Sequence, residues 1–546
     1  MCIIKAAMKI LASPKINDSR ISGNTRIRNQ AHAGSRTFRG GMKNKFFTKA
    51  ARVLCAGMTA ALFAFAFASL LASCKKSASL YPEYFALSNG LSVFVREDHK
   101  VPLAYIEIAV RAGGVTQRRD NTGIFHLYEH MMFKGNSMCK DSAAFQKTLS
   151  ELGVDDWNGT TGEHCVNYFF TIPSEDLRKG MEFWSAAIRE PLLDEAEFEA
   201  EKKVVISEIQ AEYNSPGTIL AAFFTKTFFP NAPWQLDPSG AVATVQSAKL
   251  DELKAIKEKY YVPNNAALFI GGDVDAKEVR RLAQEIFGDW EKGSFDFDSE
   301  CALQTQEPFD QTKFFVMPNE EVSPQIAQTM VYYRGPDADF DRDSSYPLDL
   351  FTNYINGPDS SFIQEILADQ DLRVISQDYA GGGYSTRRRT SSINFYAVML
   401  EPERSIPTRA KNFYSLVAEK IIPDYVKTKK IVGKKKIKEL KKIRRDEALI
   451  KSELFASMLG DARYWWTVCD KDYYYNYAKN MDKADDAGIA AALDKYLVGK
   501  NAFVVVVVNP AVYNNLKAEF DAQGFEEIKK ENAFWFNSGN ESGGKE

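Results

Sequence analysis

The sequence predicts an α+β fold made of two tandem halves, and three observations support this prediction. The chain has 546 residues, 45% of them hydrophobic and 26% charged, a globular composition in a chain too long for one domain. Strand-like and helical stretches are mixed along both halves, as in α+β or α/β proteins. A strand that runs into a turn at residues 266–275 returns 236 residues later at Ala502, which indicates a large duplicated unit.

The first half is predicted to be a domain over residues 84–292. Runs of β-branched and aromatic residues indicate strands, and apolar residues at helical spacing indicate helices. The strands are predicted near 91–95, 103–110 and 266–272, and the helices over 198–213 and 276–287.

The second half is predicted to be a domain over residues 313–537, after a polar, acidic linker at 293–312 and before a polar tail at 538–546. Its first strand, at 313–318, lies about one repeat after the strand near Tyr84. A doubly wound parallel sheet is disfavoured because no glycine-rich phosphate loop follows the first strand.

Two stretches of the second half are interpreted as structural. Residues 427–445 hold eleven basic side chains, which could touch anionic lipid but are better explained as the solvated face of a surface helix. The three glycines at 381–383 could form a flexible substrate loop but are better explained as a turn between strands.

The N-terminal region has the layout of an export signal. From Met42, four basic residues precede an apolar run at 53–71, which ends in Leu-Ala-Ser-Cys74. This end resembles the lipobox of bacterial lipoproteins, in which the cysteine is lipidated and becomes the mature N-terminus. An uncleaved membrane anchor is an alternative because the apolar run could span a bilayer, and an organellar targeting peptide is another because residues 14–52 are rich in Ser and Arg.

The lipoprotein interpretation divides the start of the chain and predicts its location. The protein is expected in the bacterial cell envelope, held by lipid and facing the periplasm or the outer surface. The predicted segments are a mis-called or discarded extension at 1–41, a signal peptide at 42–73 and a lipid-anchored linker at 74–83.

Charge and cysteine usage exclude several classes of function. The net charge of −3, from 69 basic and 72 acidic residues, gives no general attraction to nucleic acid. Seven cysteines without a CxxC pair argue against a disulfide scaffold or a cysteine zinc ribbon. The cysteines predicted to be free core thiols are Cys139, Cys165, Cys301 and Cys469.

A metal site is indicated by two of the five histidines, which lie four residues apart in a segment with helical character. His126 and His130 then project from one face of the helix, and Glu129 lies beside them. Zinc suits two imidazoles and a carboxylate, with a fourth position for water, and Glu129 is placed to act as general base. The alternative is two histidines on a solvated helix face with a chance glutamate.

The segment resembles the M16 peptidases, the inverzincin family of pitrilysin, insulin-degrading enzyme and mitochondrial processing peptidase. The matching positions of its Gly-x-x-His-x-x-Glu-His-Met-x-Phe-x-Gly motif are Gly123, His126, Glu129, His130, Met131, Phe133 and Gly135. The resemblance implies tandem M16-type domains, each an antiparallel-rich sheet packed with helices, and one Zn²⁺ per chain. It also implies Glu208 as third ligand, from Glu201-Lys-Lys-Val-Val-Ile-Ser-Glu208-Ile, and a role for Glu201 in positioning groups around the metal.

A second stretch resembles the family's substrate strand, to which the peptide adds as a β-strand. Asn158 matches the family's asparagine, which lies near the scissile bond, whereas Gly159 and Asn167 replace an alanine and an aromatic residue. With further matches at residues 260–265, 272–275 and 287–290, the resemblance covers residues 84–520.

One part of the family pattern is missing. Many M16 enzymes carry an arginine and a tyrosine that bond the substrate carbonyl, and the corresponding positions here hold Leu367 and Val374. Arg373 and Tyr379 lie nearby at the wrong spacing. A second M16-like subunit is therefore expected to supply the pair, in a homodimer or heterodimer.

Together these features predict an exported zinc metalloendopeptidase that hydrolyses extended peptides or unfolded protein segments. The first rival is a catalytically silent M16-like scaffold. The second is a lipoprotein that binds peptides without cutting them, for which the missing pair is the best evidence.

Overall fold

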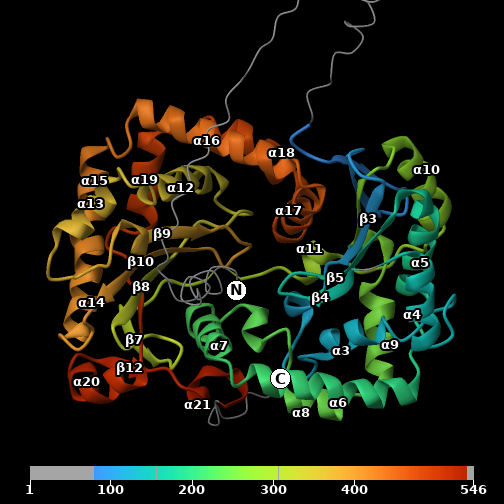
Figure 1. The fold of residues 1–546 in the computed structure, drawn as a ribbon, viewed down its shortest axis with the longest axis horizontal. Coiled ribbons are helices and arrows are strands. Elements are labelled where there is room, and N and C mark those ends of the chain that lie inside the picture. The colour runs from blue at the N-terminus through green and yellow to red at the C-terminus, as the bar shows by residue number, and fades with distance from the viewer. Residues whose placement is uncertain (1–78, 155, 305, 538–546) are drawn as a thin grey trace, which may run out of the picture. The chain divides into compact units, whose positions relative to one another are not determined.

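A computed structural model describes residues 79–537 except 155 and 305 (Figure 1). The predicted signal peptide, the lipidation site Cys74 and the polar tail at 538–546 lie outside the described residues. Within the described part of the chain, no helix is both long and apolar enough to cross a membrane. The predicted domain boundaries remain predictions.

The first sheet has six strands in the order β1-β2-β6-β3-β5-β4. Only β2 and β6 pair in parallel, so the sheet is mostly antiparallel. Its inner strands β2, β3 and β5 contain runs of buried residues, and β6 is buried throughout. The strands are β1 (Glu83–Ala86), β2 (Ser92–Glu97), β3 (Leu103–Val110), β4 (Trp157–Thr161), β5 (Val166–Pro173) and β6 (Ala266–Gly272).

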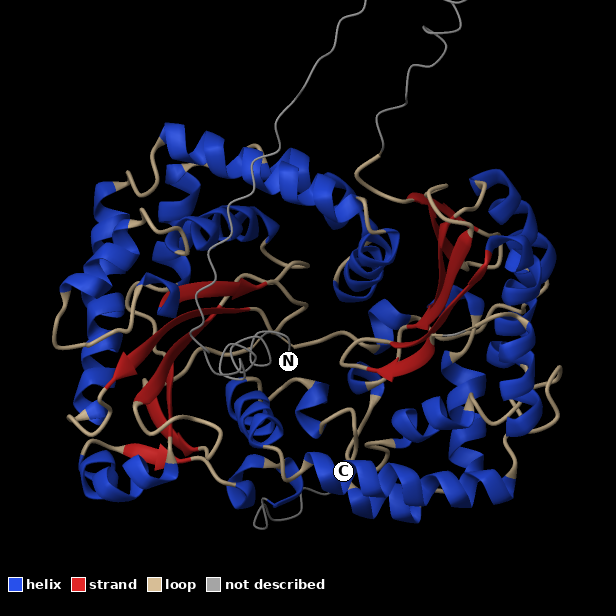
Figure 2. Cartoon of the chain, in the orientation of Figure 1, coloured by secondary structure: helices blue, strands red, loops and turns tan. Residues whose placement is uncertain are grey.

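The second sheet repeats this topology in the order β12-β7-β11-β8-β10-β9. Five strands correspond one to one with β2, β6, β3, β5 and β4, including the parallel pairing of β7 with β11. The sixth strand differs, because β1 precedes its sheet in the chain whereas β12 follows it. The strands are β7 (Lys313–Pro318), β8 (Ile326–Arg334), β9 (Ala380–Ser385), β10 (Ser392–Leu400), β11 (Phe503–Val508) and β12 (Phe525–Glu527). The α+β fold and its tandem duplication are confirmed, and Figure 2 shows the two sheets as separate layers.

Helices make up most of the remaining structure. Those of the first half are α3 (Ile124–Met131), α4 (Ser142–Glu151), α5 (Leu177–Arg189), α6 (Glu195–Glu212), α7 (Pro216–Phe228), α8 (Val242–Ser247), α9 (Leu250–Tyr260) and α10 (Ala276–Phe287). Those that follow are α11 (Phe297–Glu300), α12 (Arg342–Ile355), α13 (Ser361–Ala368), α14 (Ile406–Ser415), α15 (Ile422–Thr428), α16 (Lys434–Ser452), α17 (Phe455–Val468), α18 (Lys471–Met481), α19 (Asp486–Tyr496), α20 (Pro510–Ala522) and α21 (Lys530–Ala533). The basic stretch at 427–445 lies mainly in α16, and most of its side chains are exposed.

Each half covers part of the other half's sheet. From the first half, α7 places Phe223 and Phe228 against Phe315 and Phe503 of the second sheet. From the second half, α17 packs Leu459, Ala462 and Trp466 against the first sheet's Phe94, Ala109 and Phe269. The halves therefore share buried apolar surface, which is the main driving force for holding them together.

The glycines at 381–383 are not a turn, and that interpretation was wrong. They lie inside strand β9, where Gly382 pairs with Phe395 of β10. Their small size is required by close packing, since a Cβ on Gly382 would lie 2.7 Å from the carbonyl oxygen of Asn394. Glycine in a strand often marks such a close backbone approach, and here it mimicked a turn signal.

Candidate metal centre

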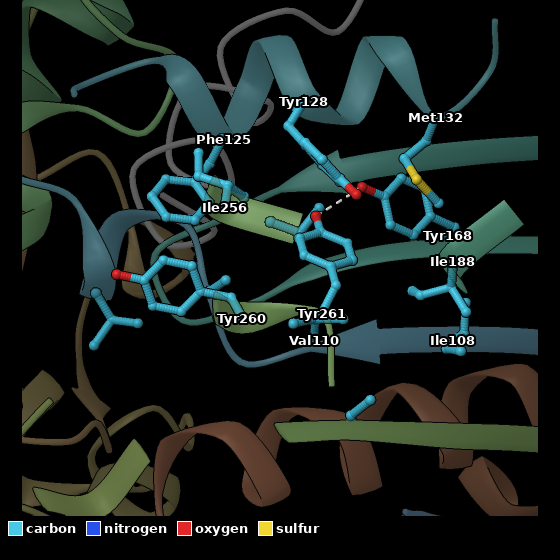
Figure 3. Close-up of a cluster of buried hydrophobic side chains, with 14 of the residues drawn as sticks. Ile108, Val110, Phe125, Tyr128, Met132, Tyr168, Ile188, Ile256, Tyr260 and Tyr261 are labelled. Carbon is cyan, nitrogen blue, oxygen red and sulfur yellow. Dashed lines mark hydrogen bonds between the residues drawn. The ribbon is translucent and has the colours of Figure 1, made fainter. Parts of the chain in front are cut away.

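Helix α3 is held against the first sheet by aromatic packing. Its Tyr128 is fully buried beside Tyr261, with ring centroids 4.4 Å apart (Figure 3). The hydroxyl groups of Tyr168 on β5 and Tyr261 form a hydrogen bond of 2.9 Å below it. This buried layer fixes the face of α3 that points away from the histidines.

Glycine at position 123 is required by the start of α3. Gly123 has φ +86°, and a Cβ there would lie 2.7 Å from the Cα of Gly240. The contact brings the segment around Ser239 against the first turn of α3. Both the left-handed backbone and the close approach exclude a larger residue.

Three side chains converge at one point from two helices. The Nε2 atoms of His126 and His130 lie 3.2 Å apart, and Oε2 of Glu208 on α6 lies 3.5 and 3.4 Å from them. Among the described residues this is the one group of three or more His, Cys, Asp or Glu side chains with ligand-like spacing. Ligand atoms about 2.0–2.1 Å from a tetrahedral zinc ion would lie roughly 3.3 Å apart. The observed separations therefore fit zinc.

The Nδ1 atoms of the two imidazoles have their own hydrogen-bond acceptors. Nδ1 of His126 lies 3.1 Å from the carbonyl oxygen of Ser239, and Nδ1 of His130 lies 3.0 Å from Oε2 of Glu201. When Nδ1 carries the proton, the Nε2 lone pairs of both rings face each other and the Glu208 carboxylate. Such an arrangement is repulsive unless a cation lies between the groups, and it is the orientation that metal-binding histidines adopt.

Glu201 lies two turns before Glu208 on α6. Its carboxylate contacts both Lys134 and His130. Its Oε1 pairs with Lys134 at 2.6 Å, while Oε2 accepts from His130. Burial opposes ionisation of this carboxyl, but the hydrogen bonds from His130 and Lys134 outweigh it and lower the pKa of Glu201. An ionised Glu201 holds the His130 ring in place.

Glu129 occupies the buried side of the centre. The residue is 8% exposed, and Oε2 accepts a hydrogen bond of 2.6 Å from the hydroxyl of Thr161 on β4. Burial raises the pKa of Glu129 above the ordinary carboxyl value, and the Thr161 bond partly opposes this. A raised pKa suits a group that must accept and then return a proton near neutral pH.

The predicted substrate strand lies beside this carboxylate. Strand β4 is an edge strand of the first sheet and pairs only with β5, so one side of its backbone is free within the sheet. Gly159 is closely packed, since a Cβ there would lie 2.9 Å from Oε1 of Glu129. Asn158 is exposed on the opposite face of the strand, where its Oδ1 accepts from the backbone N–H of Gly159.

The sequence prediction missed three residues that contact the centre. Thr161 lay within the segment compared with the family's substrate strand, but nothing in its neighbours indicated a bond to Glu129. Lys134 lies four residues after His130, a helical spacing that could have indicated it. Ser239 acts through its backbone carbonyl, which leaves no side-chain signal in the sequence.

The positions that correspond to the missing Arg/Tyr pair are apolar in structure as well as in sequence. Leu367 and Val374 pack against the core of the second half. Arg373 is held by Glu401, with 3.0 Å between Nη2 and Oε1. The described residues therefore provide no donor from these positions.

Two family models match the chain. The model described as Insulinase (Peptidase family M16) matches residues 92–237, and the model described as Peptidase M16 inactive domain matches residues 247–422. The chain belongs to peptidase family M16. The first match contains the histidines and Glu208, and the second begins within the predicted first domain.

Several relatives of this M16 chain are known proteins. Zinc protease PqqE of Helicobacter pylori is 28% identical over 207 residues, which are 38% of this chain and 46% of that protein. An uncharacterized zinc protease of Rickettsia felis is 24% identical over 207 residues, 38% of this chain and 50% of that protein. Cytochrome b-c1 complex subunit 1 of Bos taurus is 24% identical over 250 residues, 46% of this chain and 50% of that protein. The chain thus spans about half the length of these relatives.

Solved structures share the M16 fold. A protease from Helicobacter pylori has a TM-score of 0.62 at 19% identity, covering 78% of this chain and 100% of that one. The first half of the periplasmic protease PqqL from Escherichia coli has a TM-score of 0.62 at 18% identity, covering 83% and 96%. The whole of PqqL gives a TM-score of 0.63 at 18% identity and is covered to 50%. The described fold therefore corresponds to the whole of the Helicobacter pylori chain and to one half of PqqL.

Proposed function

We propose that this M16 protein is a zinc-dependent endopeptidase that hydrolyses extended peptides or unfolded protein segments. The observation that carries the proposal is the convergence of the two Nε2 atoms and Oε2 of Glu208 at separations of 3.2–3.5 Å. His126, His130 and Glu208 are the proposed ligands of one Zn²⁺, and Glu201 is proposed to orient His130.

The proposed chemistry divides between the metal and Glu129. Zinc bound by the three ligands would supply Lewis acidity, which lowers the pKa of a coordinated water toward neutrality. Glu129, ionised and held by Thr161, takes a proton from the attacking water and delivers it to the leaving amine. Burial keeps the carboxylate from being fully solvated, which strengthens its action as a base.

Peptide binding is proposed along the free edge of β4. An extended peptide can add to this edge through backbone hydrogen bonds, which read shape more than side chains. Asn158 is proposed to contact that peptide near the bond that is cut. Such a binding mode suits unfolded segments because most backbone groups of a folded protein are already paired.

A second M16-like subunit is proposed to complete the site. The apolar Leu367 and Val374 cannot stabilise the developing oxyanion, and loss of one such donor typically costs about a hundredfold in rate. The half-length match to PqqL supports this view, as do relatives named mitochondrial-processing peptidase subunit beta and cytochrome b-c1 complex subunit 1. The partner is another copy of this chain or a different M16-like chain.

The proposed location is the bacterial cell envelope, with the protein held by lipid on Cys74. The similar protein PqqL is a periplasmic protease, which is in keeping with export of this chain. Cys74→Ala is expected to release the protein from membranes into the soluble fraction. Retention of the mutant in membranes would favour an uncleaved anchor instead.

The deciding experiment measures zinc content and cleavage of a mixed peptide library for wild type and Glu129→Gln, with and without a candidate M16-like partner. Activity that needs the partner and disappears in the mutant, with zinc retained, supports the proposal. Bound zinc without cleavage in every pairing would favour the silent scaffold or the peptide-binding lipoprotein. The silent alternative draws support from the relative that is a subunit of the cytochrome b-c1 complex.

A further inference from the structure

A buried polar network connects helix α17 of the second half with the substrate strand of the first. Its members are Glu107 on β3, Asn167 on β5 and Arg463 on α17. Glu107 and Asn167 are each 1% exposed, although they lie on a sheet face that is otherwise covered by apolar contacts with α17. Polar groups so deeply buried are costly unless their partners are in place.

The contacts of the network satisfy the Glu107 carboxylate. Its Oε1 accepts from Nδ2 of Asn167 at 2.8 Å and lies 3.0 Å from Nε of Arg463. Its Oε2 accepts from the hydroxyl of Tyr105 at 2.9 Å. Arg463 also donates through Nη1 to Oδ1 of Asn167. A single guanidinium therefore lies against both buried partners, as an ion pair with Glu107 and as a hydrogen-bond donor to Asn167.

The network reaches β4 through one hydrogen bond. Thr160 is the direct cross-strand partner of Asn167, and its hydroxyl donates to Oδ1 of that residue at 2.5 Å. Successive residues of a strand point to opposite faces, so Thr161 points the other way, toward Glu129. The edge strand is thus fixed from one face by the proposed base and from the other face by α17.

The network also accounts for a departure from the family pattern. Position 167 is one of the two places where the substrate strand region differs, with asparagine in place of an aromatic residue. A phenyl ring could neither donate to Glu107 nor accept from Thr160 and Arg463. Asn167 does all three, and it joins elements from both halves of the chain.

We propose that Arg463 is a positioning residue for the substrate strand: through Asn167 and Thr160, the second half holds β4 in the geometry that accepts a peptide. The inference rests on the proposed peptidase function, because it assigns the network to peptide binding at the β4 edge. Arg463 touches neither the peptide nor the reacting atoms. Its effect therefore falls on KM for extended peptides rather than on the chemical step.

The test compares Thr160→Val, Arg463→Met and the double variant in the active form of the protein, with its partner if one is required. Thr160 is exposed and valine keeps its shape, so this variant removes one hydrogen bond with little risk to folding. Each single variant is expected to raise KM about tenfold, the equivalent of one ordinary hydrogen bond, with kcat changed less than twofold. Zinc content should not change.

The double variant distinguishes a linked network from two separate effects. Because both residues act through Asn167, the double variant is expected to raise KM no more than the larger single effect. The matched control Arg178→Met removes an exposed arginine that pairs with Glu285 on another face, and it should leave KM unchanged. Additive increases, or an unchanged KM in both single variants, would overturn the inference.

Hydrogen exchange provides a readout that does not depend on peptidase activity. Amides of β4 and the facing part of β5 are expected to exchange about tenfold faster in Arg463→Met, while α3 is unchanged. If the wild type proves inactive but this change occurs, the positioning role stands and the proposed function fails. Should Arg463→Met not fold because Glu107 is left unpaired, Glu107→Gln combined with Arg463→Met removes the buried charge and the same exchange is measured. Unchanged β4 exchange in the folded variants would refute the role of Arg463.

Discussion

The hydrogen bond from Thr161 to Glu129 allows the proposed general base to be tested without removing it. The donor lies 2.6 Å from Oε2 of the buried carboxylate and favours its ionised form. Thr161→Val removes the donor and preserves the shape of the side chain. The base must be ionised to accept a proton. The activity of Thr161→Val should therefore fall mainly at acidic pH, where more of its Glu129 is protonated than in wild type.

The size of the effect follows from the strength of that bond. A hydrogen bond to a charged group contributes about 1.5–3 kcal/mol, and one pKa unit corresponds to about 1.4 kcal/mol. Loss of the donor raises the pKa of Glu129, so the acidic limb of the kcat/KM profile should move upward by about one to two pH units. Below the limb, activity should fall by about ten- to a hundredfold. Above it, the variant should approach wild type.

The assay is the pH dependence of kcat/KM on one extended peptide, with zinc content measured at each pH. Thr225→Val is the matched control, because the hydroxyl of Thr225 bonds only the carbonyl oxygen of Ala221 within its own helix. Its profile should coincide with that of wild type. An unmoved acidic limb in folded, zinc-loaded Thr161→Val would refute the assignment of Glu129 as the base governed by Thr161.

Three further predictions concern the support of the centre and the stability of the fold. Glu201→Gln should weaken zinc binding about 10- to 100-fold in competition with a chelator, because His130 loses its ionised partner; unchanged affinity would contradict the role of Glu201. Gly123→Ala should lower the melting temperature and the zinc content together, because a Cβ would meet Gly240 at 2.7 Å in a strained backbone. Burial raises the pKa of Asp337 to about 6, so the folded state favours the protonated carboxyl. The stability that this carboxyl contributes is present at low pH and is lost as pH rises through about 6. Asp337→Asn should therefore be more stable than wild type by about 2–3 kcal/mol in urea at pH 8 and equal to it near pH 4.

The sequence predicted those features that leave a pattern of side chains. Strand and helix periodicity located β3, α6 and α10 to within a few residues, and the repeat spacing indicated the duplicated topology that the sheets show. His126 and His130 were proposed as ligands from their helical spacing, whereas Glu208 was proposed only from the resemblance to M16 peptidases. Contacts between distant segments were not predictable, since neither the Ser239 carbonyl nor the pairing of Arg463 with Glu107 follows from any local pattern. The glycines of β9 were wrongly predicted to form a turn, because in this strand they allow close packing and do not reverse the chain.

The second copy repeats the sheet topology of the first but lacks the proposed zinc ligands, and the contacts between halves indicate what the second copy contributes. Helix α12 follows β8 as α3 follows β3, yet it carries Pro347 and no histidine. The second half instead contributes α17, which packs against the first sheet. Arg463 of this helix forms an ion pair with the buried Glu107. Arg387, just after β9, forms an ion pair with Glu163 in the turn between β4 and β5. Two separate contacts from the second half thus support the substrate strand, one on the sheet face under α17 and one at the turn that follows the strand. A copy without catalytic groups can still be essential, because it fixes the edge to which the peptide is proposed to bind.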